Sequence, residues 1–277
     1  MSDALRFPPP DLDMSKPTIA RAYDALLGGK DNFEPDRDLA AAAEELNPGM
    51  TVLAQDNRAF LTRAVSYVAN ELGIEQYLDL GSGLPTAENT HQVAQRSSPQ
   101  NRVVYVDIDP MVLAHARALM VENDTTTVIT ADLRDVETVM NDPGTRRLID
   151  PDQPVCLMMV SLLHCIPDED RPFDLVQRYL GAFPSGSALV YSHIASNDAE
   201  HARILTERVR SAAPWGRIRS PEECETAVAG MDLVSPSVDG TAPARLVDCD
   251  TWRKPGTDPV EIPDKLTWEH SGIAVKP

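Results

Sequence analysis

Residues 77 to 86 read YLDLGSGLPT, and this stretch indicates how the middle of the chain folds. An apolar run that carries Asp79 and is followed by Gly81, Ser82 and Gly83 is typical of a β-strand that turns sharply into a helix. Because glycine has no Cβ, the backbone at such a turn can also approach a ligand closely. The alternative is a tight turn without a ligand, since a GxG after a strand is weak evidence by itself.

Outward from this stretch, short β-rich runs alternate with helical patterns. The predicted strands are Gln76–Leu80, Arg102–Asp107, Thr126–Thr130, Val155–Val160, Ala188–Ser192, Leu233–Pro236 and Ile273–Val275, and helices are predicted at Glu88–Arg96, Met111–Val121, Val136–Met140 and Phe173–Phe183. Alternation of this kind produces right-handed βαβ crossovers. The sequence therefore predicts an α/β fold with a mainly parallel sheet.

The chain before this region has a different texture. Residues 1–14 are rich in Pro and Asp and predict a flexible arm. Apolar residues then recur at helix spacing from Ile19 to Leu27, and again from Leu53 to Leu72. We therefore expect residues 15–73 to be helical.

The α/β core is expected over residues 74–277, with one irregular part. Residues 237–268 are rich in Pro, Asp and Thr and show little periodicity. Loops of this length in compact domains are usually functional lids or mobile segments. The sequence predicts a long loop or flap here and leaves both readings open.

The charge balance narrows the classes of partner. The 277 residues include 25 Lys and Arg against 43 Asp and Glu, a formal net charge of −18. Affinity for nucleic acid or for an anionic membrane comes mostly from cations, so neither partner is expected. The longest apolar run, Val155 to Leu163, contains Ser161 and is too short to span a bilayer.

The two ends of the compartment argument agree. The N-terminus, MSDALRFPPP, lacks the basic start and apolar stretch of a secretory signal, so a cytoplasmic location is expected. The four cysteines, Cys156, Cys165, Cys224 and Cys249, include no CxxC pair. In a reducing compartment such residues are most simply apolar packing residues, and neither a metal site nor a disulfide is expected.

The second strand ends in two acidic residues, Asp107 and Asp109. An acidic side chain at the tip of this strand can accept both hydroxyl protons of a ribose. Asp before Pro110 and an apolar periodic stretch is also an N-cap signature. We assign the helix cap to Asp109 and the ribose to Asp107.

The third strand is followed by TADLRD, residues 130–135. Here Asp132 can accept the exocyclic amine of adenine while the backbone N–H of Leu133 faces a ring nitrogen. The alternatives are a turn residue at Asp132 and a helix cap at Asp135. Together the three strand ends predict an adenosine site at the carboxyl edge of the sheet.

The residues after the glycine loop bear on which adenosine cofactor binds. A dinucleotide fingerprint needs a third glycine, so that helix amides can hold the pyrophosphate. This chain has Leu84, Pro85 and Thr86 there, and Pro85 removes an amide donor. S-adenosylmethionine has no phosphate and loses nothing, so it is favoured over NAD.

Several motifs resemble a known family. The order of LDLGSG (78–83), VYVDID (104–109), TADL (130–133) and LLHCIPD (162–168) resembles class I S-adenosylmethionine-dependent methyltransferases. More narrowly, YDALLGGKDNF (23–33), with DNRAFLTRAV and LLHCIPDED, is similar to the bacterial family called "S-adenosyl methyltransferase", formerly a domain of unknown function.

The resemblance implies a Rossmann-like, seven-stranded, mostly parallel sheet whose last strand is antiparallel, with N-terminal helices lying over the cofactor. It implies that Gly81 and Gly83 line the methionine and ribose parts, Asp107 the ribose, and Asp132 the adenine. The acceptor of the methyl group is not implied.

The motif GGKDNF (28–33) has two readings. It is either a helix C-cap with a solvated turn, or a loop over the cofactor in which Asn32 or Lys30 reaches the methionine carboxylate. In the second reading Tyr23 lies near the sulfonium. Arg58 is another candidate partner for the carboxylate, and its alternative role is that of a surface arginine.

Methyl transfer chiefly needs alignment and exclusion of water, so a catalytic side chain is not mandatory. For a hydroxyl or amine acceptor, His164 after the fourth strand is the best-placed candidate base, and His193 is the second. Either histidine can instead be satisfied by backbone carbonyls. The acidic residues 168–170 are expected to start a helix with Pro172 rather than to bind a metal.

The sequence therefore predicts a methyltransferase that uses S-adenosylmethionine and acts on an unidentified small-molecule acceptor. The alternatives are a sensor or scaffold that binds S-adenosylmethionine or S-adenosylhomocysteine without turnover, and an NAD-dependent oxidoreductase. The candidate cofactor-binding residues are Tyr23, Asn32, Arg58, Asp79, Gly81, Ser82, Gly83, Asp107, Ile108, Asp132, Leu133 and Ser161, with His164 as the candidate catalytic residue.

Overall fold

The computed structural model describes residues 13–85, 88–119 and 124–277. The predicted flexible arm, residues 1–14, therefore lies outside the described residues except for Asp13 and Met14. Within the described residues, no helix is both long enough and apolar enough to cross a membrane.

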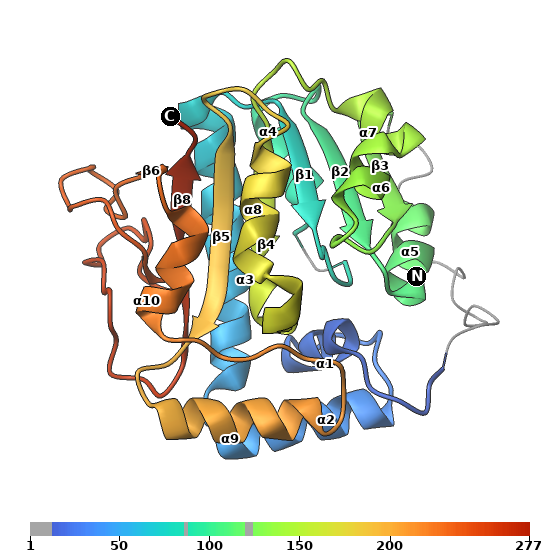
Figure 1. Ribbon diagram of the computed structural model, residues 1–277, viewed down its shortest axis with the longest axis vertical. Helices are drawn as coiled ribbons and strands as arrows, with labels where there is room; N and C mark the ends of the chain where they lie inside the picture. The colour runs from blue at the N-terminus through green and yellow to red at the C-terminus, as the bar shows by residue number, and fades with distance from the viewer. Residues whose placement is uncertain (1–12, 86–87, 120–123) are drawn as a thin grey trace.

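The centre of the molecule is a mixed sheet of eight strands (Figure 1). These are β1 (Gln76–Leu80), β2 (Arg102–Asp107), β3 (Thr126–Thr130), β4 (Cys156–Val160), β5 (Ala188–Ala195), β6 (Asp232–Leu233), β7 (Val247–Asp248) and β8 (Trp268–Val275). Their order is β3-β2-β1-β4-β5-β8-β6, and β7 also pairs with β8.

The first five strands are parallel, and β8 runs antiparallel to β5, β6 and β7. This confirms the predicted α/β fold with an antiparallel last strand. The short strand β7 makes eight strands where seven were predicted, because a pair of residues in the irregular 237–268 segment joins the sheet edge.

Helices cover both faces of the sheet. They are α1 (Ile19–Leu26), α2 (Glu34–Leu46), α3 (Met50–Tyr67), α4 (Thr90–Ser97), α5 (Pro110–Leu119), α6 (Val136–Asn141), α7 (Pro143–Leu148), α8 (Pro172–Leu180), α9 (Ala199–Arg210) and α10 (Pro221–Cys224). The α3 helix continues into a π-helical turn, Val68–Leu72. The predicted helix Met111–Val121 extends past Leu119 into residues that lie outside the described ones.

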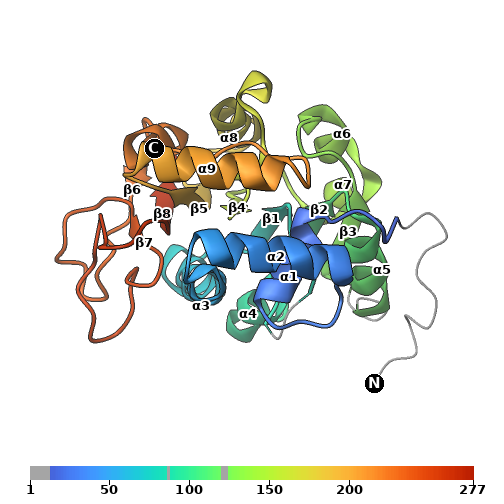
Figure 2. The same cartoon turned by 90° about the horizontal axis from the view of Figure 1, so that it is seen from below.

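The central strands are buried on both faces because each face packs against helices. Alternate residues of β1 point to opposite sides, so Leu78 joins one hydrophobic cluster and Tyr77 joins the other. One cluster includes Val176 of α8, and the other includes Phe60 of α3. Figure 2 shows α8 and α6 on one side of the sheet and α3 and α4 on the other.

Three helices lie across the carboxyl ends of the strands (Figures 1 and 2). The helices α1 and α2 come from the N-terminal segment, as the resemblance implied. The third, α9, was not predicted, because its charged sequence AEHARILTERVR leaves only a narrow apolar stripe at Ala202, Leu205 and Val209.

The segment 237–268 packs along α3 and β8 rather than over the strand ends. Trp252 is fully buried and meets the ring of Phe60 edge-on at 5.4 Å between centroids. Arg63 of α3 donates hydrogen bonds to the backbone oxygens of Trp252 and Cys249, at 2.8 and 2.5 Å. These contacts fasten the segment to the side of the sheet.

The strand β8 is longer than predicted and begins at Trp268 instead of Ile273. Its first half contains Glu269, His270 and Ser271, and the structure buries all three completely. A polar run reads as a loop from the sequence, since buried strands are normally apolar.

Candidate active site

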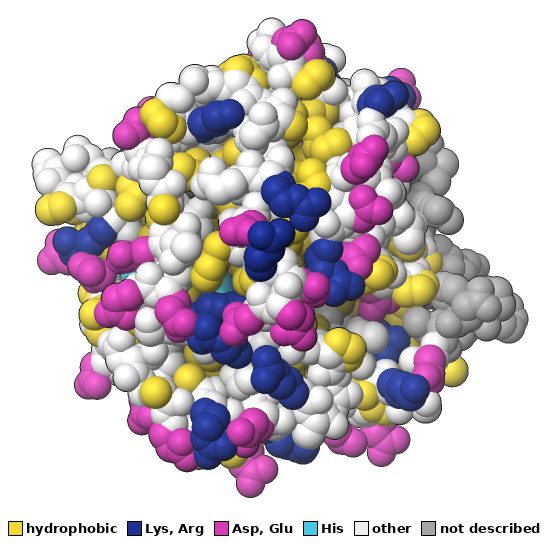
Figure 3. Space-filling model, viewed as in Figure 1, with side chains coloured by type: hydrophobic (Ala, Val, Ile, Leu, Met, Phe, Trp, Pro, Cys, Tyr) yellow, Lys and Arg dark blue, Asp and Glu magenta, His cyan; other side chains and the backbone are white. Residues whose placement is uncertain are grey.

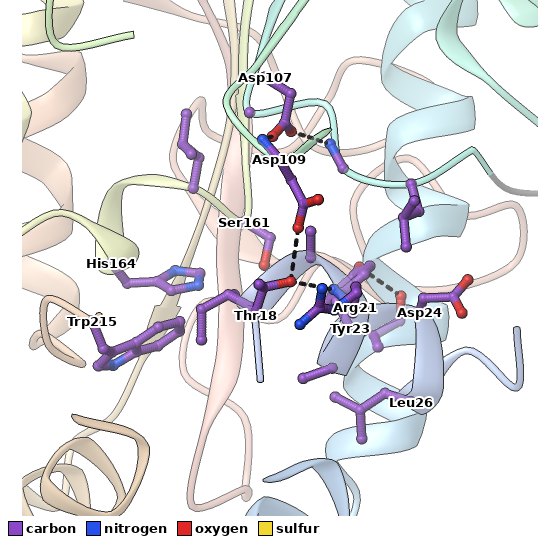
Figure 4. A pocket seen from close by; sticks show the side chains of 18 of the residues that line it. Thr18, Arg21, Tyr23, Asp24, Leu26, Asp107, Asp109, Ser161, His164 and Trp215 are labelled. Atoms are coloured by element: carbon purple, nitrogen blue, oxygen red, sulfur yellow. Dashed lines mark hydrogen bonds between the residues drawn. The ribbon is translucent and has the colours of Figure 1, made fainter. Parts of the chain in front are cut away.

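A cavity of about 700 Å³ lies between the carboxyl ends of the strands and the helices α1, α2 and α9 (Figure 4). Twelve of the thirteen candidate residues line it: Tyr23, Arg58, Asp79, Gly81, Ser82, Gly83, Asp107, Ile108, Asp132, Leu133, Ser161 and His164. The remaining candidate, Asn32, lies outside this lining. Cavities of this size are typical of small-molecule and cofactor sites.

The loop after β1 curls toward the end of β2. Gly81 has φ +64°, and a Cβ there would lie 2.4 Å from a methyl carbon of Leu162. Both its backbone conformation and its close approach therefore require glycine. Gly83, with φ +66°, donates its backbone N–H to Asp107 Oδ2 at 2.9 Å. The two strand ends are thereby joined at the cavity wall.

The carboxylate of Asp107 is anchored by backbone donors. Its Oδ1 accepts the N–H of Asp109 at 2.9 Å, and burial raises its pKa above the ordinary value. Asp109 Oδ1 accepts the N–H of Met111 at 2.8 Å, which confirms the predicted cap of α5. The geometry therefore leaves Asp107, and not Asp109, as the cavity carboxylate free of a capping role.

Asp79 and Arg58 lie on neighbouring parts of the lining. Asp79 is buried and accepts a hydrogen bond from Thr90 Oγ1 at 2.7 Å. Burial raises the pKa of Asp79 to about 6. Arg58 donates to the backbone oxygen of Glu88 at 2.8 Å, so it is held at the wall rather than extended into solvent.

The third predicted strand end is more open. Asp132 reaches the lining, but its carboxylate binds the guanidinium of Arg134 through both oxygens, with Nε to Oδ1 at 2.9 Å. This ion pair holds the pKa of Asp132 below its ordinary value. The backbone oxygen of Leu133 accepts from Tyr179 at 2.6 Å. Asp135 caps α6 by accepting the N–H of Thr138, as one reading predicted.

A chain of hydrogen bonds ties the N-terminal helices to the end of β4. Tyr23 donates to the backbone oxygen of Ala54 at 3.1 Å and accepts from the amide of Asn57 at 3.0 Å. Ser192 donates to Asn57 at 2.7 Å and accepts the N–H of Ser161 at 2.8 Å. The cover is thus positioned by directed polar contacts as well as by packing.

Ser161 occupies a strained position on the cavity wall. Its φ of 54° lies in the left-handed region, which is uncommon for a residue with a Cβ. Its hydroxyl donates to Glu269 Oε1 at 2.5 Å. Glu269 is fully buried, its second oxygen has no partner among the described residues, and burial raises its pKa to about 7. Strain of this kind concentrates at functional sites.

The GGKDNF loop closes on Asp24 instead of on the cavity. Asp24 Oδ2 accepts the N–H of Asp31 at 3.0 Å and the amide of Asn32 at 2.8 Å. Gly28, with φ +72°, follows the end of α1, so the helix-ending reading describes this motif. Neither Lys30 nor Asn32 contributes to the lining among the described residues, so neither is placed to reach a bound carboxylate.

His164 lies on the opposite wall from Asp24 (Figure 4). Its Nδ1 accepts the backbone N–H of Ile194 at 3.1 Å, which places the ring proton on Nε2. Burial is the main cause that lowers its pKa well below the ordinary value. A neutral ring that is a donor at Nε2 and already accepts at Nδ1 does not suit the predicted role of base.

The second candidate base, His193, lies outside the lining. Its Nδ1 donates to the backbone oxygen of Ile194 at 2.8 Å, and Nε2 accepts from Arg219 at 3.0 Å. Burial, with Arg219 as a further cause, lowers the pKa of His193 to about 3. The structure therefore gives His193 a packing role.

The acidic run 168–170 was expected to start a helix, and it forms a separate 3₁₀ turn instead. Helix α8 does begin with Pro172, but Arg171 occupies its N-cap position with φ 48°. The first carboxylate of the run pairs with Arg219 at 2.6 Å, and the last pairs with Arg134 at 2.6 Å. Long-range arginine partners, which sequence spacing does not show, outcompete the cap.

Several cavity residues were missed from the sequence. Thr18 caps α1 and donates to Asp109 Oδ2 at 2.8 Å, so it links the cover to β2. Arg21 is 1% exposed and forms an ion pair with Asp36 at 3.0 Å. A buried arginine on the first helix gives no local signal, because its partner lies on another helix. Trp215, in the loop after α9, also had no motif to mark it.

Comparison with known proteins agrees with this geometry. No curated protein matches the chain. A crystal structure of a proposed methyltransferase from Thermobifida fusca YX is 44% identical, covers 98% of this chain and 99% of its own, and superposes with a TM-score of 0.86. A DUF574 family protein from Streptomyces avermitilis MA-4680 is 31% identical over 96% of this chain and 99% of its own, with a TM-score of 0.83.

The family model described as S-adenosyl methyltransferase matches residues 6–277, which is nearly the whole chain. The motifs that carried the resemblance, the strand order and the cavity at the strand ends all lie within this match. The chain therefore belongs to the S-adenosyl methyltransferase family and is a methyltransferase whose cofactor is S-adenosylmethionine.

Proposed function

We propose that this enzyme methylates a small-molecule acceptor inside the cavity between the strand ends and the helical cover. The observation that carries the proposal is the placement of α1, α2 and α9 across the strand ends (Figure 2), with the cavity beneath them. A small molecule can be enclosed there, whereas a duplex or a folded protein would have to displace three helices. The net charge of −18 also disfavours nucleic acid.

The described residues fit S-adenosylmethionine at the strand ends. Each oxygen of Asp107 accepts one backbone N–H and keeps a further lone pair, so the carboxylate can accept the two ribose hydroxyls. Ile108, which is 63% exposed at the cavity edge, offers an apolar contact to adenine. We assign the exocyclic amine to Asp132 and a ring nitrogen to the backbone of Leu133.

The methionine end requires groups of both charges. Arg58 is the cation of the lining that we assign to the carboxylate, in place of Lys30 and Asn32. Asp79 and the hydroxyl of Ser161 are the acceptors that we assign to the ammonium group. The glycine loop, Gly81 to Gly83, lets the backbone approach the ligand without side-chain bulk.

When bound, S-adenosylmethionine supplies a methyl group that is already activated on a sulfonium. The residues of this chain therefore contribute alignment and a water-poor wall more than acid–base chemistry. The left-handed Ser161 is held by its backbone N–H and by its hydroxyl, so its position is defined before any ligand arrives. Reaction then depends on which acceptor the rest of the cavity holds.

The proposal is tested with radiolabelled cofactor. Purified protein is incubated with S-adenosylmethionine carrying a tritiated methyl group and with a metabolite extract, then separated into small-molecule, RNA and protein fractions. We expect label in the small-molecule fraction and formation of S-adenosylhomocysteine. Label confined to RNA or protein would overturn the small-molecule assignment, and tight binding without any transfer would favour the sensor or scaffold.

A further inference from the structure

A second part of the cavity wall is apolar, and it extends away from the strand ends onto the cover. We call it the apolar chamber. It is lined by Leu26 of α1, Ala43 of α2, Met50 and Leu53 of α3, Ile194 at the end of β5, Leu205 and Val209 of α9, and Trp215 and Ile218 after α9. The same side chains form one hydrophobic cluster. An occupant of this chamber gains stability by removing apolar surface from water.

The charged groups near the chamber already have partners. The guanidinium of Arg21 pairs with Asp36 at 3.0 Å. Asp24 is 5% exposed, accepts two hydrogen bonds from its own loop, and lies across the pocket from Trp215 (Figure 4). A cationic occupant would therefore meet apolar side chains, and burying an unpaired charge in such a place is costly.

His164 is the polar side chain at the boundary of the chamber, and it is held rigidly. Its Nδ1 is engaged by the backbone N–H of Ile194, and its ring lies 4.8 Å from the ring of Trp215. The imidazole is 2% exposed and lines the cavity. It therefore offers one fixed hydrogen-bond donor, Nε2–H, to whatever fills the chamber.

We infer that the methyl acceptor is a largely apolar small molecule that places a neutral or anionic oxygen on the Nε2–H of His164, and that ammonium compounds are excluded. The inference rests on the proposed function, since it takes the chamber as the acceptor site. It follows from the donor at His164, the apolar wall and the paired state of the nearby carboxylates. The sulfonium of the cofactor adds positive charge that favours the same choice.

The test uses matched probes and isothermal titration of the full chain saturated with S-adenosylhomocysteine. The probes are 2-naphthol, which presents an oxygen, and 2-naphthylmethylamine, which presents an ammonium on a similar ring. We expect the naphthol to bind at least tenfold more tightly. His164→Phe should weaken naphthol binding roughly threefold to tenfold, the loss of one neutral hydrogen bond.

His164→Gln is the matched variant. Glutamine can accept the Ile194 N–H through Oε1 and donate through Nε2, so it should retain naphthol binding within about twofold of wild type. A side chain that acts by ring packing alone would give the reverse result, with Phe retained and Gln weakened. A base cannot be replaced by glutamine, so the pair also separates the donor role from the base role.

A second variant keeps the inference testable where His164 variants do not fold. Leu26 is half-buried, and Leu26→Glu introduces a carboxylate into the chamber. We expect it to weaken naphthol binding and strengthen amine binding, which would reverse the preference. Thermal melts of every variant establish that each is folded.

Titrations with and without S-adenosylhomocysteine keep two failures apart. Absence of binding by S-adenosylhomocysteine would count against the proposed function, while the probes alone still report on the chamber. Equal binding of amine and naphthol, or a Gln variant that behaves like the Phe variant, would overturn the inference about the acceptor and leave methyl transfer intact.

Discussion

Glu269 is buried in β8 behind the cavity wall, and its replacement by glutamine has a measurable consequence. The carboxyl donates no buried cation a partner: it receives the hydroxyl of Ser161 at 2.5 Å, and burial raises its pKa from an ordinary 4.5 to about 7. The native state therefore holds a proton at a pH where the unfolded chain has lost it. Stability contributed by this proton is present below pH 4.5 and is lost as pH rises toward 7.

The magnitude follows from the difference between the two pKa values. A separation from 4.5 to about 7 corresponds to roughly 3 kcal/mol of unfolding free energy across the full range. Glu269→Gln keeps an oxygen for Ser161 and removes the titration. The free energy of unfolding of the variant, minus that of wild type, should therefore rise by roughly 2 to 3 kcal/mol between pH 5 and pH 8.

Urea unfolding at pH 5, 6, 7 and 8 measures this difference, and subtraction cancels the other titrating groups. The amide of glutamine can cost stability where the second oxygen of Glu269 has no partner, but that offset does not vary with pH. Glu200→Gln, on the exposed face of α9, is the matched control and should give a flat difference over the same range. A flat difference for Glu269→Gln as well would refute the reasoning.

Three further substitutions test the site. Asp107→Ala should weaken binding of S-adenosylhomocysteine more than tenfold by isothermal titration, because a charge-assisted contact is worth roughly 1.5–3 kcal/mol. Gly29→Ala should lower stability by roughly 1–3 kcal/mol in urea unfolding, since the new Cβ would lie 2.0 Å from Asp24 Oδ1. Arg21→Met should lower stability by roughly 3–5 kcal/mol, because it strands the buried carboxylate of Asp36.

Each of these substitutions has a control. Asp135→Ala also removes an aspartate at a helix start, but outside the cavity lining, so it should leave the binding isotherm unchanged. Adding Asp36→Leu to Arg21→Met should recover much of the lost stability, since both charges are then gone. An unchanged isotherm for Asp107→Ala, or a double variant no more stable than Arg21→Met, would contradict the corresponding role.

Local chemistry explains which parts of the fold could be predicted. The strands β1 to β5 are apolar on both faces, and the glycine loop and the cap at Asp109 depend on residues close in sequence. The position of twelve candidate residues around one cavity follows from this, because parallel strands bring their carboxyl ends to the same edge. The family motifs extended the prediction to the cofactor.

Other features depend on partners far away in the chain. The cover is fastened by Thr18 to Asp109, 91 residues apart, and Ser161 meets Glu269 across 108 residues. Helix α9 closes the apolar chamber with a stripe too narrow to predict. No local pattern encodes such pairs, because their energy exists only after the sheet has brought them together.

The sequence by itself determined the α/β class, the glycine loop and the acidic strand ends, since these arise from short-range backbone and hydropathy rules. Only the tertiary structure decided that Asn32 faces Asp24 instead of the cavity, that His164 is a donor, and that a polar strand, β8, is buried. The physical reason is the same in each case. A polar side chain is committed by the nearest buried partner, and that partner is chosen by packing between distant segments.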